Sequence, residues 1–158
     1  MTKRLTDRSA AMGAVQQLQN VERYVHSTGL DHRLLELVKM RVSQVNGCAF
    51  CLAMHAKALR EAGEREDRIA VLPAWRETDW FSDQERAALA WAEAVTTLEH
   101  QHVPDDVYEQ ARAQFDERDL ADLTLAIIAI NGWNRLNIAL TQSEPTPFTM
   151  DAEVEAAD

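Results

Sequence analysis

Hydrophobic residues recur along this chain at intervals of three and four, which is the spacing of one face of an α-helix. The clearest stripe consists of Leu34, Val38, Val42 and Val45. With Asp31 placed to cap its start, this stripe predicts an inward-facing helix that runs to about residue 45. Similar patterns predict further helices over residues 15–28, 48–61, 65–72, 82–98, 104–115 and 118–141.

Glycines and capping residues mark where these helices should begin and end. Gly29 and Gly63 follow two of the predicted helices and are placed to stop them. Asn46-Gly47 supplies a turn between the next pair, because glycine adopts left-handed backbone conformations readily. Ser82 and Glu85 have the spacing of a capping box, and Pro104 suits a first helical turn.

Composition agrees with an all-α fold. Only 5 glycines and 4 prolines occur among 158 residues, which argues against a strand-rich sandwich or barrel. No repeat or shift in composition marks a second domain. We therefore expect one compact multi-helix domain over residues 1–145, followed by an acidic, disordered tail at 146–158. The last predicted helix is the most apolar, so part of it should be buried on several sides or lie between subunits.

Charge excludes some classes of partner. The net charge of −10 disfavours nucleic acid and anionic membranes, since both are bound through basic surfaces. Residues 1–10 are charged and lack the apolar core of a secretory signal, and the apolar run at 123–130 is too short to span a bilayer. The simplest expectation is a cytoplasmic protein.

Both cysteines of the chain lie in one motif, Cys48-Ala49-Phe50-Cys51, with His55 four residues further on. In a reducing cytoplasm such a pair is more often catalytic or metal-binding than a static cross-link. On a helical wheel, Cys48, Cys51 and His55 share one inward stripe with Leu52 and Leu59, whereas Phe50 falls on the far side. Residues three apart on a helix are close enough for a disulfide.

The start of a helix favours a reactive thiol. Free backbone N–H groups and a nearby protonated histidine both stabilise the thiolate, which is the nucleophilic form. Lowering a cysteine pKa by about two units makes the thiolate the majority species at neutral pH, and it takes about 2.7 kcal/mol. The helix dipole and His55 together suffice for an effect of that size.

Two other interpretations of the motif stay open at this point. Buried cysteines are often merely small apolar residues, and a histidine on an inner face is often a hydrogen-bonded core residue. Alternatively, Cys48, Cys51 and His55 would be three ligands of a zinc ion, which needs a fourth. The remaining histidines, His26, His32, His100 and His102, supply no second pair that contains a cysteine. We therefore predict no metal and no cofactor.

The segment 35–55 resembles the core of the alkylhydroperoxidase D-like (AhpD-like) proteins, which belong to the carboxymuconolactone decarboxylase superfamily. The shared pattern is Glu36, eleven residues, and then Cys-x-x-Cys-x-x-x-His, ending at His55. The similarity extends over about residues 12–145. Its further matches are Ala62-Gly63-Glu64, Trp75-Arg76-Glu77-Thr78, Glu85-Arg86-Ala87-Ala88-Leu89-Ala90-Trp91 and Asn131-Gly132-Trp133-Asn134-Arg135.

This resemblance implies an all-helical homo-oligomer, a trimer or hexamer, with thiol peroxidase or disulfide reductase activity. Cys51 would attack the peroxide after deprotonation through a relay of His55, Glu36 and a water molecule. Cys48 would then resolve the sulfenic acid as a disulfide. A dithiol, such as a lipoyl or thioredoxin-like protein, would be the reductant.

Helix geometry independently favours this order of the two cysteines. Cys51 lies one helical turn from His55, whereas Cys48 lies two turns away, so proton transfer is easier for Cys51. Cys48, at the helix start, should be more accessible to an external reductant. Glu36 depends mostly on the resemblance, because the wheel places it away from the apolar stripe, near Lys39 and Ser43. Without the resemblance it would be a solvated glutamate paired with Lys39.

One position departs from the pattern of the family. Phe50 stands where the best-characterised members carry a relay histidine, so the relay here is shorter and peroxide turnover should be slow. The substrate would then be a disulfide or another electrophile. The alternatives are a decarboxylase-type lyase, a branch that does not depend on a CxxC pair, and a non-enzymatic redox sensor.

Overall fold

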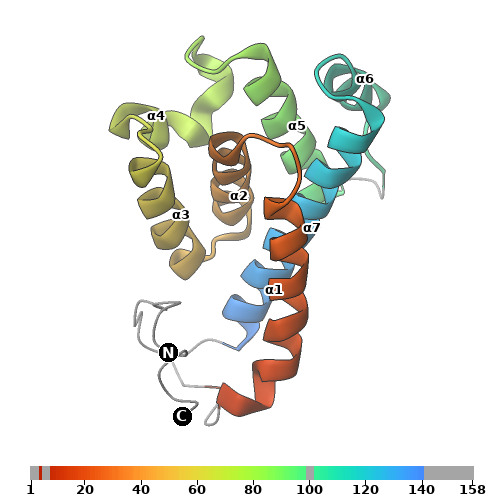
Figure 1. The fold of residues 1–158 in the computed structure, drawn as a ribbon. Helices are drawn as coiled ribbons and strands as arrows, with labels where there is room; N and C mark the ends of the chain where they lie inside the picture. The colour runs from red at the N-terminus through yellow and green to blue at the C-terminus, as the bar shows by residue number, and fades with distance from the viewer. Residues whose placement is uncertain (1–3, 5–7, 99–101, 141–158) are drawn as a thin grey trace.

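The computed structural model describes residues 4, 8–98 and 102–140 of the chain, and every regular element within them is helical (Figure 1). The all-α prediction is confirmed. The predicted tail at 146–158 lies outside the described residues. No described helix has the length and hydrophobicity that a membrane crossing requires.

The helices follow the predicted order, with ends displaced by a few residues. Two short 3₁₀ elements were not predicted, one over Arg8–Ala11 and one over Leu72–Glu77. In the second, the chain keeps turning through Pro73, because the proline occupies the first turn and needs no N–H group. The elements are η1 (Arg8–Ala11), α1 (Met12–His26), α2 (His32–Asn46), α3 (Ala49–Glu61), α4 (Glu66–Val71), η2 (Leu72–Glu77), α5 (Asp83–Thr97), α6 (Asp105–Arg112) and α7 (Glu117–Ala139).

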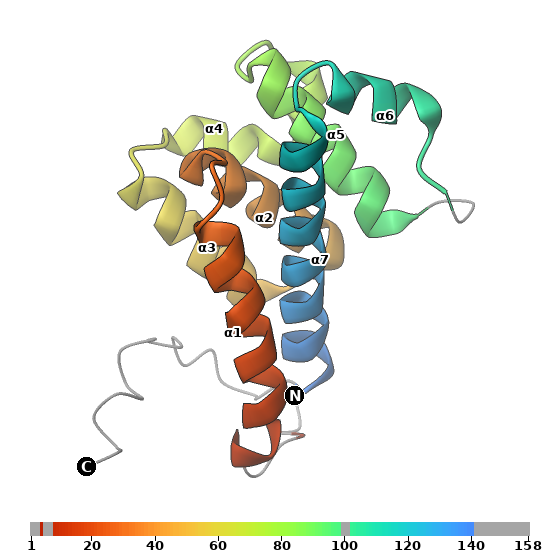
Figure 2. The same cartoon turned by 45° about the vertical axis from the view of Figure 1, so that its right-hand side comes forward.

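Helix α2 lies at the centre of the molecule and packs against α3, α5 and α7. Helices α1 and α7 run side by side in opposite directions, as both views show (Figures 1 and 2). Tyr24 of α1 donates a hydrogen bond of 2.9 Å to Asp122 of α7 and joins the two. Because neighbours cover α2 on several sides, even its polar residues Glu36, Lys39 and Ser43 are buried.

The largest core cluster contains the predicted stripe of α2. Leu34, Val38 and Val42 pack there with Ile127 of α7, and full burial of such side chains contributes about 1.5–3 kcal/mol each. Val45 is an error of the prediction, since it is 36% exposed. It shares the face of the stripe but lies in the last turn of α2, where Asn46 makes the contact with α7.

Most of the predicted caps are present. Asp31 accepts a hydrogen bond of 2.9 Å from the backbone of Leu34, and Ser82 and Glu85 form the reciprocal capping box. Gly29 does not end α1 as predicted. The helix stops at His26, and the hydroxyls of Ser27 and Thr28 satisfy the carbonyls of its last turn.

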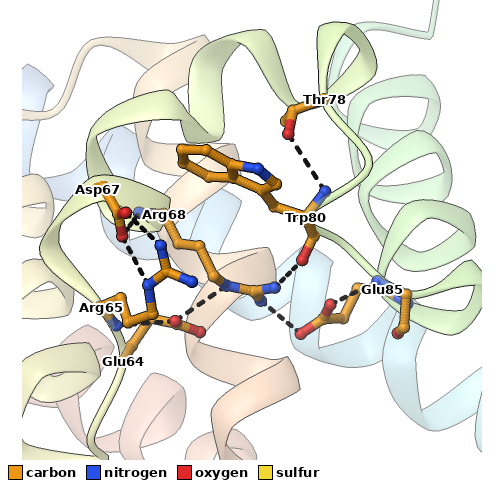
Figure 3. Close-up of polar contacts among 8 residues, drawn as sticks. Glu64, Arg65, Asp67, Arg68, Thr78, Trp80 and Glu85 are labelled. Atoms are coloured by element: carbon orange, nitrogen blue, oxygen red, sulfur yellow. Dashed lines mark hydrogen bonds and ion pairs between the residues drawn. The ribbon is translucent and has the colours of Figure 1, made fainter.

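An arginine fastens α4 to the start of α5 (Figure 3). Arg68 forms ion pairs with Glu64 at 2.9 Å and with Glu85 at 2.7 Å, and it donates to the carbonyl of Trp80. Its guanidinium lies 4.5 Å above the ring of Phe81. Glu85 also belongs to the capping box, so its ion pair with Arg68 connects the first turn of α5 to α4.

Candidate active site

The turn between α2 and α3 places the cysteine motif. Gly47 has the left-handed conformation predicted for it, with φ of 70°, and its N–H bonds back to Gln44. The chain then enters α3 with Cys48 as the capping residue, whose sulfur accepts a hydrogen bond of 3.4 Å from the N–H of Cys51. The Cys48 sulfur therefore lies on the positive end of the helix dipole, where a thiolate is stabilised.

Asparagines fix this turn against α7. The amide nitrogen of Asn46 lies 2.9 Å from the side-chain oxygens of both Asn131 and Asn134. Asn134 is fully buried and donates in turn to Ser43 at 3.1 Å. A satisfied network of this kind is rigid, since breaking it would leave buried amides without partners.

Cys48 and Cys51 are joined as a disulfide, with their Cα atoms 5.4 Å apart. The two residues are 2% and 1% exposed, and both belong to the main core cluster. The expectation that Cys48 would be accessible to an external reductant is wrong for this structure, since both residues are buried to nearly the same degree. The first turn of α3 faces α2 and α7, so its start is covered by the core.

His55 of α3 and Glu36 of α2 form a buried contact. The Nδ1 atom of His55 lies 2.8 Å from the Glu36 carboxylate, and both residues are buried. The interpretation of Glu36 as a solvated glutamate is therefore wrong. Burial raises the pKa of Glu36, but the hydrogen bond with His55 and the charges of His55, Lys39 and His32 outweigh it, so the pKa lies below its ordinary value.

This contact distinguishes the two nitrogens of the His55 ring. An ionised Glu36 accepts the Nδ1–H of the ring, which leaves the lone pair of a neutral ring on Nε2. Nε2 is buried and has no hydrogen-bond partner within the described part of the chain. His55 follows Cys51 by one helical turn, so this buried nitrogen without a partner is a candidate proton acceptor for that thiol.

Sequence reasoning missed a contact to the second sulfur. Asn137 of α7 has its amide nitrogen 3.6 Å from the sulfur of Cys51. The only signal in the sequence is its position one turn beyond Asn134, which itself belongs to one of the matching motifs. The two sulfurs thus receive different donors, a backbone N–H on Cys48 and a side-chain amide on Cys51.

The zinc interpretation finds no ligand set in this part of the molecule. Within residues 8–98 and 102–140, no group of three His, Cys, Asp or Glu side chains is arranged to hold a metal ion.

Comparison with known proteins decides the family. The profile of the carboxymuconolactone decarboxylase family matches residues 10–94. This chain belongs to that family. It is 40% identical over 140 residues to the uncharacterized protein YdfG of Bacillus subtilis, covering 89% of this chain and 95% of YdfG. It is 32% identical over 111 residues to the uncharacterized protein YnjA of Escherichia coli, covering 70% and 60% of the two chains.

Solved structures place the chain among the AhpD-like members of the carboxymuconolactone decarboxylase family. A protein of unknown function from Agrobacterium tumefaciens, provisionally described as the antioxidant defence protein AhpD, superposes with a TM-score of 0.84 at 40% identity, covering 89% of this chain and 97% of that one. An uncharacterized peroxidase-related protein from a Silicibacter species shares the fold at 20% identity, with a TM-score of 0.71, over 82% and 69% of the chains.

Phe50 lies between the two cysteines, in the first turn of α3. Its side chain is partly buried and packs against the main core cluster, although the helical wheel predicted the far side of α3. Phe50 thus gives the first turn of α3 an apolar side chain next to the two cysteines. The ionisable groups of the candidate site are Glu36 and His55.

Proposed function

We propose that this protein is a thiol-dependent oxidoreductase of antioxidant defence that reduces peroxides at the Cys48–Cys51 pair. One observation carries the proposal: a disulfide within the first turn of a helix lies one turn from a buried His55–Glu36 pair. Family membership and the likeness to the Agrobacterium tumefaciens protein support the antioxidant assignment.

In the proposed cycle the reduced protein begins with two thiols. Nε2 of His55 accepts the proton of Cys51, and the thiolate attacks the terminal oxygen of a hydroperoxide ROOH. The O–O bond breaks, Cys51 becomes a sulfenic acid, and the alkoxide takes the proton held by His55 to leave as ROH. Cys48 then gives up its thiol proton and attacks the Cys51 sulfur as a thiolate. The S–O bond breaks, the disulfide forms, and the departing hydroxide takes up that proton as water.

The contacts around each sulfur suit these functions. The N–H of Cys51 stabilises negative charge on Cys48, which makes Cys48 a ready nucleophile for the resolving step. Asn137 donates to Cys51, the position where charge accumulates when that sulfur is a thiolate or a leaving group. Glu36 holds the ring of His55 in the tautomer that a base requires.

The cycle closes with an external dithiol, which reduces the disulfide by exchange and leaves as its own disulfide. The net reaction converts ROOH and a dithiol into ROH, water and a disulfide. We propose that the reductant is a lipoyl group or a thioredoxin-like protein. We also propose that the protein acts in the cytoplasm as a homo-oligomer. Since Phe50 replaces the relay histidine, we expect turnover to be slow.

Peroxide consumption by the reduced protein tests the proposal. Hydrogen peroxide and cumene hydroperoxide are supplied with dihydrolipoamide, and turnover by wild type is compared with that of Cys51→Ser and Cys48→Ser. We expect saturable turnover that Cys51→Ser abolishes, while Cys48→Ser performs a single oxidation and accumulates a sulfenic acid. Turnover that survives Cys51→Ser would show the assignment to be wrong.

A further inference from the structure

A buried lysine, Lys39, lies between Glu36 of the His55–Glu36 pair and the partly exposed Glu22 of α1. The Lys39 side chain is only 3% exposed, and its Nζ atom lies 2.7 Å from Glu22 of α1 and 3.8 Å from Glu36 of its own helix. Burying an ammonium group is costly unless carboxylates compensate it, and here one stands on each side. None of the motif patterns in the sequence requires a lysine at this position.

The charges form a continuous chain across three helices. His55 of α3 contacts Glu36, Glu36 faces Lys39, and Lys39 contacts Glu22, whose side chain is 20% exposed. His26 continues the chain along α1, with Nε2 3.7 Å from Glu22 and its side chain 45% exposed. This row of charged side chains thus begins at His55, one helical turn from Cys51, and ends at Glu22 and His26, which are partly exposed to water.

We propose that Lys39, held in place by Glu22, is a positioning residue that keeps Glu36 ionised and thereby sets the pH at which the Cys51 thiol becomes reactive. This inference rests on the proposed function of Cys48 and Cys51 as a reactive dithiol. It adds Lys39 and Glu22 to a site that otherwise consists of Cys51, Cys48, His55, Glu36 and Asn137.

The physical argument is electrostatic. Glu36 interacts with His55 from α3, with Lys39 and His32 from its own helix and with His26 from α1. Lys39 in turn interacts with Glu22 and His26, both from α1. A positive charge beside Glu36 makes it costlier to add a proton to the Glu36–His55 pair. The pair therefore stays available as a base down to a lower pH than it would without Lys39.

Because Lys39 and Glu22 carry opposite charges, their removal should shift the pH at which the Cys51 thiol becomes reactive in opposite directions. Removing Lys39 as Lys39→Met lets the pair hold a proton at higher pH, so the thiol should become reactive only at higher pH. Removing Glu22 as Glu22→Gln leaves Lys39 to act on Glu36 alone, so reactivity should begin at lower pH. A purely structural function of the Lys39–Glu22 contact would give no such difference in sign, because both substitutions break the same contact.

The experiment measures the rate at which the reduced full-length protein is alkylated by iodoacetamide between pH 4.5 and pH 10, with mass spectrometry to follow Cys51. We expect the midpoint to rise by about half a pH unit or more in Lys39→Met, to return in Lys39→Arg, and to fall by a smaller amount in Glu22→Gln. Lys57→Met is the matched control, because the side chain of Lys57 on α3 is 76% exposed. Its midpoint should equal that of wild type.

The inference is overturned if Lys39→Met folds and its midpoint is unchanged, or if Lys39→Met and Glu22→Gln shift the midpoint in the same direction. If Lys39→Met does not fold, an unchanged midpoint in Glu22→Gln overturns it. The result is separable from the proposed function, since alkylation needs no peroxide. A shifted midpoint without peroxide turnover would refute only the peroxidase assignment, and turnover with an unshifted midpoint would refute only the function of Lys39.

Discussion

His55 and Glu36 are nineteen residues apart in the sequence, yet Nδ1 of the imidazole lies 2.8 Å from the carboxylate. The turn at Asn46 and Gly47 brings α3 back along α2 and creates this contact. Because both side chains are buried, their interaction is little screened by water. The geometry makes the pair the natural first target for substitution.

Substituting either member of the pair should impair the thiol chemistry. His55→Ala removes the proposed base, so we expect peroxide reduction at pH 7 to fall by about a hundredfold or more, since general bases typically contribute that much. Glu36→Gln keeps the shape but not the charge, and should produce a smaller loss. The measurements are turnover and thiol titration of the reduced protein. If neither variant alters the pKa of the reactive thiol, the relay of His55 and Glu36 does not operate.

Asn137→Ala should weaken the environment of the Cys51 sulfur. The variant loses a donor at 3.6 Å, and a hydrogen bond of this kind contributes about 0.5–1.5 kcal/mol. We expect the alkylation rate of reduced Cys51 to fall by about two- to tenfold. Gln110→Ala, at an exposed position of α6, serves as the control. An unchanged rate in Asn137→Ala would mean that the amide has no influence on the thiolate.

Gly47→Ala should destabilise the fold, because Gly47 has a φ of 70° that an alanine adopts only with strain. We expect a loss of about 1–2 kcal/mol in the free energy of unfolding, measured with urea. Gly13→Ala is the matched control, since Gly13 lies inside α1 with nothing near its missing Cβ. That variant should gain about 0.5–1 kcal/mol through helix propensity. Equal effects of the two substitutions would contradict the conformational argument.

Acidification should destabilise the protein partly through Glu93. Burial raises the pKa of Glu93, but hydrogen bonds from Trp75, Arg41 and Arg76 outweigh it, so the pKa lies below its ordinary value of 4.5. A carboxylate with a depressed folded pKa contributes stability above its unfolded pKa, and this contribution disappears as the pH falls through the folded value. We expect the free energy of unfolding to decrease from about pH 5 downward.

The Glu93→Gln variant isolates this contribution. Its stability should be lower than that of wild type at pH 7 and should decrease less steeply as the pH falls, because the lost carboxylate can no longer take up a proton. Glu109→Gln, at an exposed position of α6, controls for the loss of one negative charge. An identical slope in Glu93→Gln and wild type would exclude Glu93 as a source of the acid sensitivity.

Local patterns accounted for most of the fold, and tertiary contacts accounted for what was missed. The capping box at Ser82 and the turn at Gly47 follow from interactions within a few residues, so the sequence suffices to predict them. The contact of Glu36 with His55 came from the family resemblance, because a wheel for a single helix assumes one buried face. Helix α2 has several, which is why the burial of Lys39 was not predicted either.

The contacts made by Asn137 and Glu93 lie beyond any local pattern. Each depends on how helices far apart in the sequence are placed, Asn137 against α3 and Glu93 against α2 and η2. Residue type alone does not distinguish such side chains from solvated ones. Val45 is an error of the opposite kind, because it was predicted to be buried and is exposed. Periodicity identifies the face of a helix that is buried, but it does not show where along the helix the neighbouring elements stop covering that face.

The burial of both sulfurs has a kinetic consequence. With Cys48 and Cys51 2% and 1% exposed, a reductant reaches the disulfide of this chain only when neighbouring side chains move aside. Access is then a local opening equilibrium of the first turn of α3, and the rate of exchange is the intrinsic rate multiplied by the open fraction. If the pair reacts as proposed, the stability of this one helical turn sets how fast oxidants and reductants alike reach the two sulfurs.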